Sequence, residues 1–399
     1  STDLDKRLAA WESSKEVGIA LKDGLENLQY LRNKVAREMG YSSFFDLEVA
    51  DYGLTVDEMM TLMDNLVDDI QPLYNELLTW VRYKLAERYN APVPEKIPAH
   101  WLPNRWGQSW PGIIEAVNLD DLFEGKSAEW INETAEDFYM SVGFDSLNDN
   151  FWERSDLYPV PEGSSRKKNN HASAWHLDLE NDYRSLMSVE PNHRWFGTAH
   201  HELGHIYYYI EYSNPNVPLL LRRGANRSYH EGIGTLMEVA ASQRPYLQHL
   251  GLLSEDVEID EIQWLLNEAL DMVVFIPFGA GTMTHFEYEL YEKDLPKKQY
   301  NKRWWELVEK YQGFVPPFPR GEEFCDAASK THINDDPAQY YDYALSNILV
   351  YQLHNHIATK ILKQDARNCN YYGNNKVGGF LKSIMRPGRS KDWRKVLKE

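Results

Sequence analysis

A pentapeptide near the middle of the chain carries two imidazoles and a carboxylate at a spacing that suits a metal ion. It reads His201-Glu202-Leu203-Gly204-His205 and lies in a segment whose apolar residues recur at helical spacing. Because residues four positions apart share one face of a helix, both histidines can reach the same Zn²⁺. Glu202 projects from an adjacent face and would hold the water that the metal activates. A solvated helix surface with polar side chains explains the pentapeptide, taken alone, about equally well.

A catalytic zinc site needs a third protein ligand and leaves one position for water. Glu231 is the candidate, since it stands in the first turn of a second predicted helix downstream of His205. Ser228 and Glu231 also have the spacing of a capping box, and this is the better interpretation of the segment taken alone. The preference reverses once the two-histidine motif is considered, because a loop with Pro215 and Pro218 can bring the second helix back to the first.

The elements that must position these residues are mainly helices. Leu28, Leu31 and Val35 recur at helical spacing within residues 1–90, and helical periodicity dominates again after Trp175. Residues 171–175, His-Ala-Ser-Ala-Trp, are interpreted as a short exposed strand. Since no repeat, low-complexity tract or separating linker is found, we expect a mostly α protein with a single domain over residues 1–399.

The composition limits the partners that the protein can take. The chain has 399 residues, of which 43% are hydrophobic, and a formal net charge of −19. So acidic a chain is a poor binder of polyanions, and we expect no nucleic acid partner. Cys325 and Cys369 are too few for a disulfide scaffold and lack the spacing of a thiolate metal site. No stretch approaches the roughly 18 consecutive apolar residues of a membrane span, so no transmembrane segment is expected.

Five blocks of residues along the chain can be compared with known families. The first is Asn-Arg-Trp-Gly-Gln-Ser-Trp at 104–110, and the second is the strand at 171–175. The third comprises the two candidate zinc segments at 200–205 and 224–231, the fourth comprises residues 304–305 and 310–313, and the fifth comprises residues 330–332 and 340–343. In this order they resemble the angiotensin-converting-enzyme family of zinc peptidyl-dipeptidases, and the similarity spans nearly the whole chain. The resemblance implies two helical halves that flank a deep cleft within one large helical domain. It also indicates a bacterial member that is shortened at both ends.

The resemblance implies a role for each matching residue at the reaction centre. One Zn²⁺ per chain would be held by His201, His205 and Glu231. Glu202 would be the general base that later donates its proton to the leaving amine. Tyr343 and the metal would stabilise charge on the tetrahedral oxygen, and His332 would bind the substrate backbone. Without the resemblance, His332 and Tyr343 are better interpreted as a packed histidine and a core tyrosine.

The resemblance also implies a substrate site. The peptide backbone would contact the exposed strand, where small side chains leave room for a peptide to add to its edge, at His171, Ala172 and Ala174. The terminal carboxylate would bind Gln108, Lys330 and Tyr340. The last side chain would contact Asp271, Phe275 and Phe278. Because the carboxypeptidase-type relative has an arginine in place of Gln108, a glutamine at this position favours the release of dipeptides.

The sequence departs from the family pattern at two functional places. Arg82 matches one chloride-binding arginine, but Val308 and Asp342 stand where two others are expected. We therefore expect the chloride site to be lost and chloride not to be required, since an aspartate repels an anion. Thr235 stands where the family has a carboxylate that orients a zinc histidine, and Glu238 is the candidate substitute.

The leading hypothesis is a zinc peptidyl-dipeptidase that acts on short peptides with a free C-terminus. A zinc carboxypeptidase or oligopeptidase of similar fold is one alternative, and a non-catalytic peptide-binding homologue is another. The location usual in the family favours a secreted or periplasmic protein. No signal segment is found in the sequence, and a cytoplasmic location is also compatible with the sequence. The oligomeric state does not follow from the sequence.

Overall fold

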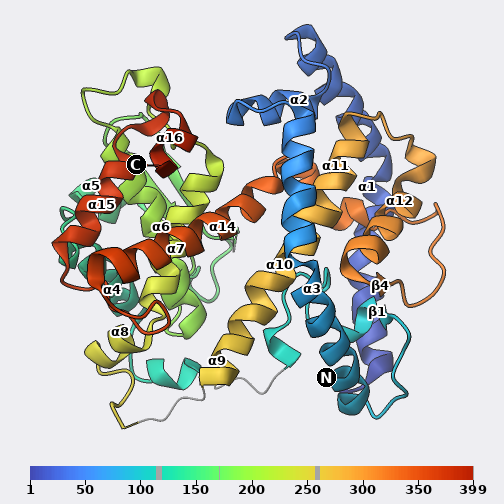
Figure 1. Ribbon diagram of the computed structural model, residues 1–399, viewed down its shortest axis with the longest axis horizontal. Helices are drawn as coiled ribbons and strands as arrows, with labels where there is room; N and C mark the ends of the chain where they lie inside the picture. Colours follow the sequence, from blue (N-terminus) through green and yellow to red (C-terminus); the bar gives the residue numbers. More distant parts are fainter. Residues whose placement is uncertain (114–118, 170, 257–260, 399) are drawn as a thin grey trace. The chain divides into compact units, whose positions relative to one another are not determined.

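Helices make up most of the structure, a computed structural model that describes residues 1–113, 119–169, 171–256 and 261–398 (Figure 1). The prediction of a mostly α protein is confirmed. Contacts within the chain divide it into two compact units, each of which is built from two separate segments. Unit 1 consists of Ser1–Ala116 and Ile259–Ala344, and unit 2 consists of Val117–Glu258 and Leu345–Glu399.

Unit 1 is framed by the two longest helices. Helix α1 (Leu4–Glu38) begins after Asp3, whose carboxylate accepts hydrogen bonds from the first backbone N–H groups of the helix. Helix α3 (Val56–Arg88) begins with a capping box in which Thr55 and Glu58 each bond the other's backbone N–H. The long helices predicted within residues 1–90 are therefore confirmed. The other elements of unit 1 are α2 (Phe44–Val49), α9 (Glu261–Glu268), α10 (Val274–Ile276), α11 (Thr284–Tyr291), α12 (Tyr300–Leu307), α13 (Thr331–Asp335) and the parallel strand pair β1 (Ile97–Pro98) and β4 (Phe314–Val315).

The buried face of α1 is not its most apolar stripe. Trp11 and Leu25 are buried, but the same face also buries Lys15. By contrast, 44% of Leu31 and 51% of Val35 is exposed. The apolar periodicity thus predicts the helix correctly, whereas the side that packs depends on its neighbours in unit 1.

One helical stretch of the described residues resembles a membrane span in length and composition. Residues Leu265–Tyr291 contain a window with a mean hydropathy of 1.2, which is long and apolar enough by length and composition. However, 67% of that window is buried inside the protein. Phe278 and Met283, for example, are fully buried, as in a core helix, because contact with protein favours apolar side chains just as contact with lipid does.

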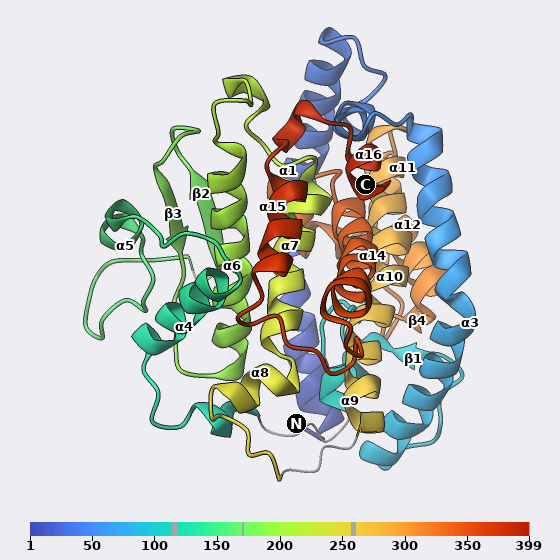
Figure 2. The ribbon, with the colours of Figure 1, turned by 60° about the vertical axis from the view of Figure 1, so that its left-hand side comes forward.

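Unit 2 is built around α6 (His193–Tyr212). Figure 2 shows α6 with α7 (Arg227–Ala241) on one side and the antiparallel hairpin of β2 (Ser173–His176) and β3 (Tyr183–Leu186) on the other. The predicted exposed strand at 171–175 is thereby confirmed with slightly shifted bounds. The remaining helices of unit 2 are α4 (Ala128–Ser141), α5 (Asp149–Arg154), α8 (Arg244–His249), α15 (Asn375–Met385) and α16 (Trp393–Lys398). Helix α14 (Tyr341–His356) begins in unit 1 and ends in unit 2.

Short helical turns connect these elements. The 3-10 turns are Ala50–Tyr52, Ala99–Trp101, Pro111–Ile113, Leu119–Phe123, Leu219–Leu221, Lys297–Gln299, Ala327–Ser329 and Gly388–Ser390. The π-helical turns are Ala269–Val273, Pro277–Met283, Val308–Gln312 and Ile357–Leu362. Cys325 and Cys369 are free and buried, as expected.

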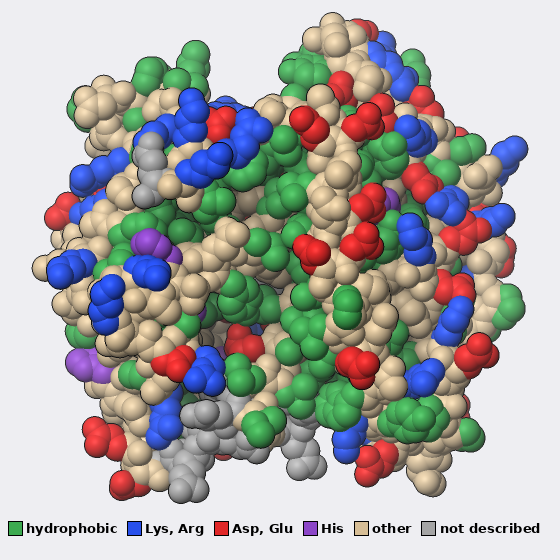
Figure 3. Space-filling view, viewed as in Figure 1, with side chains coloured by type: hydrophobic (Ala, Val, Ile, Leu, Met, Phe, Trp, Pro, Cys, Tyr) green, Lys and Arg blue, Asp and Glu red, His purple; other side chains and the backbone are tan. Residues whose placement is uncertain are grey.

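Acidic and basic side chains are both spread over the face drawn in Figure 3. The net charge of −19 is the reason why no polyanionic partner is expected. The absence of a nucleic acid partner stays a prediction.

Candidate metal centre

The two histidines of the pentapeptide lie on one face of α6. The helix begins after Asn192, whose side chain accepts a hydrogen bond from the N–H of Trp195 at 2.9 Å. It therefore starts earlier than the apolar periodicity indicates, and residues 201–205 lie well inside it. The ring centroids of His201 and His205 are 4.9 Å apart, as expected for neighbours separated by about one turn.

Glu231 enters the site from α7. This helix begins after Asn226, whose side chain accepts a hydrogen bond from the N–H of Tyr229 at 2.9 Å. The capping-box interpretation of Ser228 and Glu231 is therefore wrong, because the cap lies two residues before Ser228. The carboxylate of Glu231 is left free to face the histidines of α6.

The three side chains converge on a common point within unit 2. Glu231 Oε2 lies 3.6 Å from His201 Nε2 and 3.9 Å from His205 Nε2. One donor atom from each residue falls within 4.8 Å of the other two. Two imidazole nitrogens and one carboxylate oxygen form the donor set of a catalytic zinc site with one open position, so the residues present fit this metal. Their role as zinc ligands stays a prediction.

Burial and mutual charge shape the electrostatics of the site. Burial raises the pKa of Glu202 to about 7, although His201 opposes this shift. Burial likewise lowers the pKa of His205 to about 4. Burial alone would raise the pKa of Glu231, but its contacts with the two imidazoles hold that pKa well below its usual range. The carboxylate of Glu231 is thus ionised and ready to bind a cation at neutral pH.

Glu202 differs from Glu231 because one of its carboxylate oxygens lacks a hydrogen-bond partner among the described residues. Its side chain is buried, and Oε2 has no hydrogen-bond partner among the described residues. An unpaired buried carboxylate is costly to a fold. Its position between the two histidines suits a base that accepts a proton from a water molecule.

The Nδ1 atoms of the two histidines have different partners. His201 Nδ1 lies 3.6 Å from Glu238 Oε2 and 3.4 Å from the hydroxyl of Thr235. The carboxylate that the family places four residues after the third ligand is therefore replaced by one from Glu238, two turns after it. His205 Nδ1 lies 2.8 Å from His230 Nδ1. Sequence reasoning missed His230, although a histidine beside a candidate metal ligand was a usable signal.

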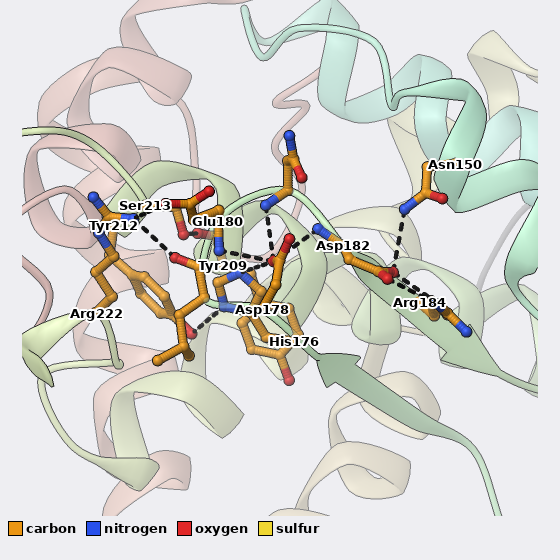
Figure 4. Close-up of polar contacts among 12 residues, drawn as sticks. Asn150, His176, Asp178, Glu180, Asp182, Arg184, Tyr209, Tyr212, Ser213 and Arg222 are labelled. Carbon is orange, nitrogen blue, oxygen red and sulfur yellow. Dashed lines mark hydrogen bonds and ion pairs between the residues drawn. The ribbon is translucent and has the colours of Figure 1, made fainter. Parts of the chain in front are cut away.

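The hairpin that carries the predicted peptide-binding strand is anchored to α6. Within the described residues, β2 pairs with β3 on one edge and with no strand on the other. The hydroxyl of Tyr209 donates to the carbonyl of Ala174 at 3.1 Å. The ring of Tyr209 stacks on His176, and both residues are labelled in Figure 4. His171 is exposed, and its Nδ1 lies 2.8 Å from the carbonyl of Ala172.

The turn of the hairpin is held by its own acidic residues. Asp178 accepts hydrogen bonds from the backbone N–H groups of Glu180, Asn181 and Asp182 (Figure 4). These bonds fix the turn and leave the β2 edge at residues 173–176 as the extended segment on which a peptide could align.

A second cluster lies within unit 1. Lys330 is buried and donates to the side-chain oxygen of Gln108 at 3.2 Å. The ring of Tyr340 lies 5.1 Å from Tyr343 and 5.3 Å from His332, measured between centroids. The structure therefore brings together the residues that the resemblance assigns to carboxylate binding and transition-state stabilisation, without testing those roles.

Of the three residues assigned to the last side chain of the peptide, two pack against Tyr340 and one is exposed. Phe275 and Phe278 pack against Tyr340, with ring centroids 5.8 and 5.5 Å from it. Asp271 is exposed, one turn before Phe275 on the same helical stretch.

Arg82, the matching chloride residue, donates to the backbone carbonyl of Glu95 at 2.9 Å.

Two histidines on one helix, a glutamate between them and a glutamate from the next helix match the residue pattern of the gluzincin class of metallopeptidases. A sequence profile described as "Peptidase_M2: Angiotensin-converting enzyme" matches residues 1–399, and the chain belongs to this family of metallopeptidases. The family expected from the sequence blocks is thus confirmed.

Three relatives are similar to the chain over all or nearly all of its length. Angiotensin-converting enzyme of Rattus norvegicus is 32% identical over 421 residues, which cover 100% of this chain and 31% of the rat enzyme. The enzyme of Bos taurus is 32% identical over 414 residues, covering 98% and 31% respectively. The enzyme of Theromyzon tessulatum is 30% identical over 419 residues, covering 100% and 66%. The chain spans less than two thirds of the length of each of these relatives.

Proposed function

We propose that the chain is a zinc-dependent peptidyl-dipeptidase that releases dipeptides from the C-terminus of short peptides. The observation that carries this proposal is the convergence of His201, His205 and Glu231 beside the buried Glu202, whose Oε2 has no hydrogen-bond partner among the described residues. These residues supply three metal ligands and one base, which is what hydrolysis of a peptide bond by activated water requires.

The protein residues would share the work of hydrolysis. Zinc, when bound by the three ligands, supplies Lewis-acid activation of water and of the peptide carbonyl. Glu202 accepts the proton of the attacking water at its carboxylate and delivers it to the leaving amine. Tyr343 and His332 donate hydrogen bonds to the substrate, so that charge developing on the carbonyl oxygen meets fixed donors.

The cut position would be set by the carboxylate cluster of unit 1. The ammonium of Lys330 lies 5.2 Å from the ring of Tyr340 and 5.4 Å from that of Phe278, so a peptide carboxylate bound there would meet a largely dehydrated cation. Gln108 and Tyr340 supply further polar groups.

One experiment tests the proposal against its alternatives. The zinc content of the purified protein is measured, and the protein is incubated with a tripeptide that is blocked at its N-terminus, followed by mass analysis of the products. A free dipeptide and one zinc per chain support the proposal. Release of a single amino acid would indicate a carboxypeptidase, and a zinc-loaded protein that binds the peptide without cleaving it would indicate a peptide-binding homologue.

We also propose, from the location usual in the family, that the protein is secreted or periplasmic. Fractionation of the source cells, followed by detection with an antibody, would test this location.

A further inference from the structure

We propose that His230 is a positioning residue that fixes the tautomer and the orientation of the zinc ligand His205. The inference rests on the proposed zinc site, and it concerns a residue that is not one of the three proposed ligands.

The hydrogen bond between the two rings determines which nitrogen of His205 can bind a metal. The Nδ1 atoms of His205 and His230 are 2.8 Å apart, so one of them carries the hydrogen and the other accepts it. His205 Nε2 is the atom that faces Glu231 and the proposed metal. A metal-binding Nε2 must keep its lone pair free, which places the hydrogen on Nδ1 of His205. His230 Nδ1 is therefore the acceptor that holds His205 in the metal-binding tautomer.

The surroundings of His230 keep its ring in place. The ring of Tyr208 stacks on it with centroids 4.6 Å apart and an angle of 30°. The rings of Tyr209 and Tyr212 lie at 5.0 and 6.3 Å. On another side, a Cβ added to Gly224 would lie only 2.9 Å from Cδ2 of His230. The acceptor nitrogen cannot turn away from His205 without displacing these neighbours, because closely packed rings leave no space for rotation.

An imidazole is also the acceptor that suits the charge of this site. Three carboxylates, those of Glu202, Glu231 and Glu238, already surround His201. Zinc ligands usually donate to a carboxylate, a carbonyl or water. An uncharged acceptor next to His205 provides the hydrogen bond without adding a fourth negative charge. A fourth buried carboxylate would repel the other three and destabilise the metal-free protein.

The test compares two variants of His230, one that keeps an aromatic ring without a hydrogen-bond acceptor and one that keeps an acceptor without the ring. His230→Phe keeps a planar ring but removes the acceptor, whereas His230→Asn keeps an acceptor oxygen. His249→Phe is the control, since His249 lies in the same unit and its ring packs against that of Tyr372, with centroids 4.3 Å apart, and not against a proposed ligand. For each variant, zinc affinity is measured by competition with a chelator, and the Tm of the metal-free protein and the absorption spectrum of the Co²⁺-loaded protein are recorded.

We expect His230→Phe to lower zinc affinity by about 10- to 100-fold, a range typical for loss of a partner to a metal ligand, and to alter the Co²⁺ spectrum. His230→Asn should recover most of the affinity, and His249→Phe should match the wild type. Wild-type zinc affinity in His230→Phe overturns the proposal. A loss that His230→Asn does not recover, and that parallels a fall in the Tm of the metal-free protein, overturns it as well.

The same measurements separate this inference from the proposed function. A wild-type protein that binds one zinc ion but cleaves no peptide contradicts the proposed function and leaves the role of His230 to the affinity comparison. A wild-type protein that binds no zinc overturns both.

Discussion

Gly204 of α6 lies so close to Gly234 of α7 that a Cβ added to Gly204 would stand 2.7 Å from the Cα of Gly234. A Cβ added to Gly234 would in turn stand 3.0 Å from the ring and the carbonyl of His201. The absence of side chains at both positions lets the two helices approach each other where the proposed ligands converge. The glycine within the pentapeptide is therefore part of the geometry that joins Glu231 to the two histidines.

Replacing Gly204 with alanine should separate these helices. The new methyl group would meet the Cα of Gly234 and the hydroxyl of Tyr139, the latter at 3.0 Å. We expect a loss of about 1–3 kcal/mol in the free energy of unfolding, as for other overpacked cores, together with weaker zinc binding. Thermal unfolding and zinc titration measure both. Gly379→Ala in α15 is the control, because an added Cβ there meets nothing within 4 Å, and the prediction is wrong if the two variants behave alike.

Replacing Glu202 with glutamine should separate metal binding from catalysis. The amide keeps the size of the side chain but cannot accept the proton of the attacking water. We expect kcat to fall by about 10²- to 10⁴-fold, the range of general-base catalysis, while zinc content stays at the wild-type level. Steady-state kinetics and metal analysis on the same preparation decide the matter, and unchanged turnover would refute Glu202 as the base.

Replacing Glu238 with glutamine should weaken the interaction that orients the ring of His201. The variant removes the carboxylate 3.6 Å from Nδ1 and leaves the hydroxyl of Thr235 as the partner. We expect zinc affinity to fall by about 10- to 100-fold. Adding Thr235→Asp to this variant should restore affinity, because it places a carboxylate where the wider family has one. The exposed Glu190→Gln is the control, and equal zinc affinity in the Glu190 and Glu238 variants would contradict the assignment.

The affinity for peptides should depend on pH through Lys330. Burial lowers the pKa of Lys330 to about 7, and the nearby Arg105 contributes to the shift. The ammonium is therefore present below pH 7 and is lost as the pH rises, so that carboxylate binding above pH 7 requires uptake of a proton. We expect KM to rise with pH above 7 by up to about tenfold per pH unit.

Lys330→Arg supplies the comparison for this pH dependence. Its guanidinium stays charged throughout the range, so its KM should vary less with pH above 7. The same peptide with an amidated C-terminus should bind weakly at every pH. Identical pH profiles of KM for the wild type and Lys330→Arg would show that Lys330 does not bind the peptide carboxylate.

Activity should not require chloride. Asp342 is buried and accepts a hydrogen bond from the hydroxyl of Tyr52, and it stands where the resemblance expects an arginine. A carboxylate at this place repels a halide ion. We expect equal turnover in acetate and chloride buffers of the same ionic strength. A turnover that is much higher in chloride buffer than in acetate buffer would show that an anion site exists in spite of Val308 and Asp342.

The sequence alone determined the features that depend on neighbours along the chain. The shared face of His201 and His205 follows from a helical spacing of four, and the helix follows from local periodicity. The order of five sequence blocks was enough to identify the family, because blocks of matching residues rarely follow one another in the same order by chance.

Only the tertiary structure decided the features that depend on packing between helices. Ser228 and Glu231 have the spacing of a cap, and only the position of Asn226 as the true cap shows that Glu231 is free to face the histidines. The replacement of a missing carboxylate by Glu238, and the contact of His230 with His205, arise where α6 and α7 meet. Sequence spacing cannot reveal such contacts, since the loop between two helices leaves their relative rotation and approach to be set by glycine contacts and by the core.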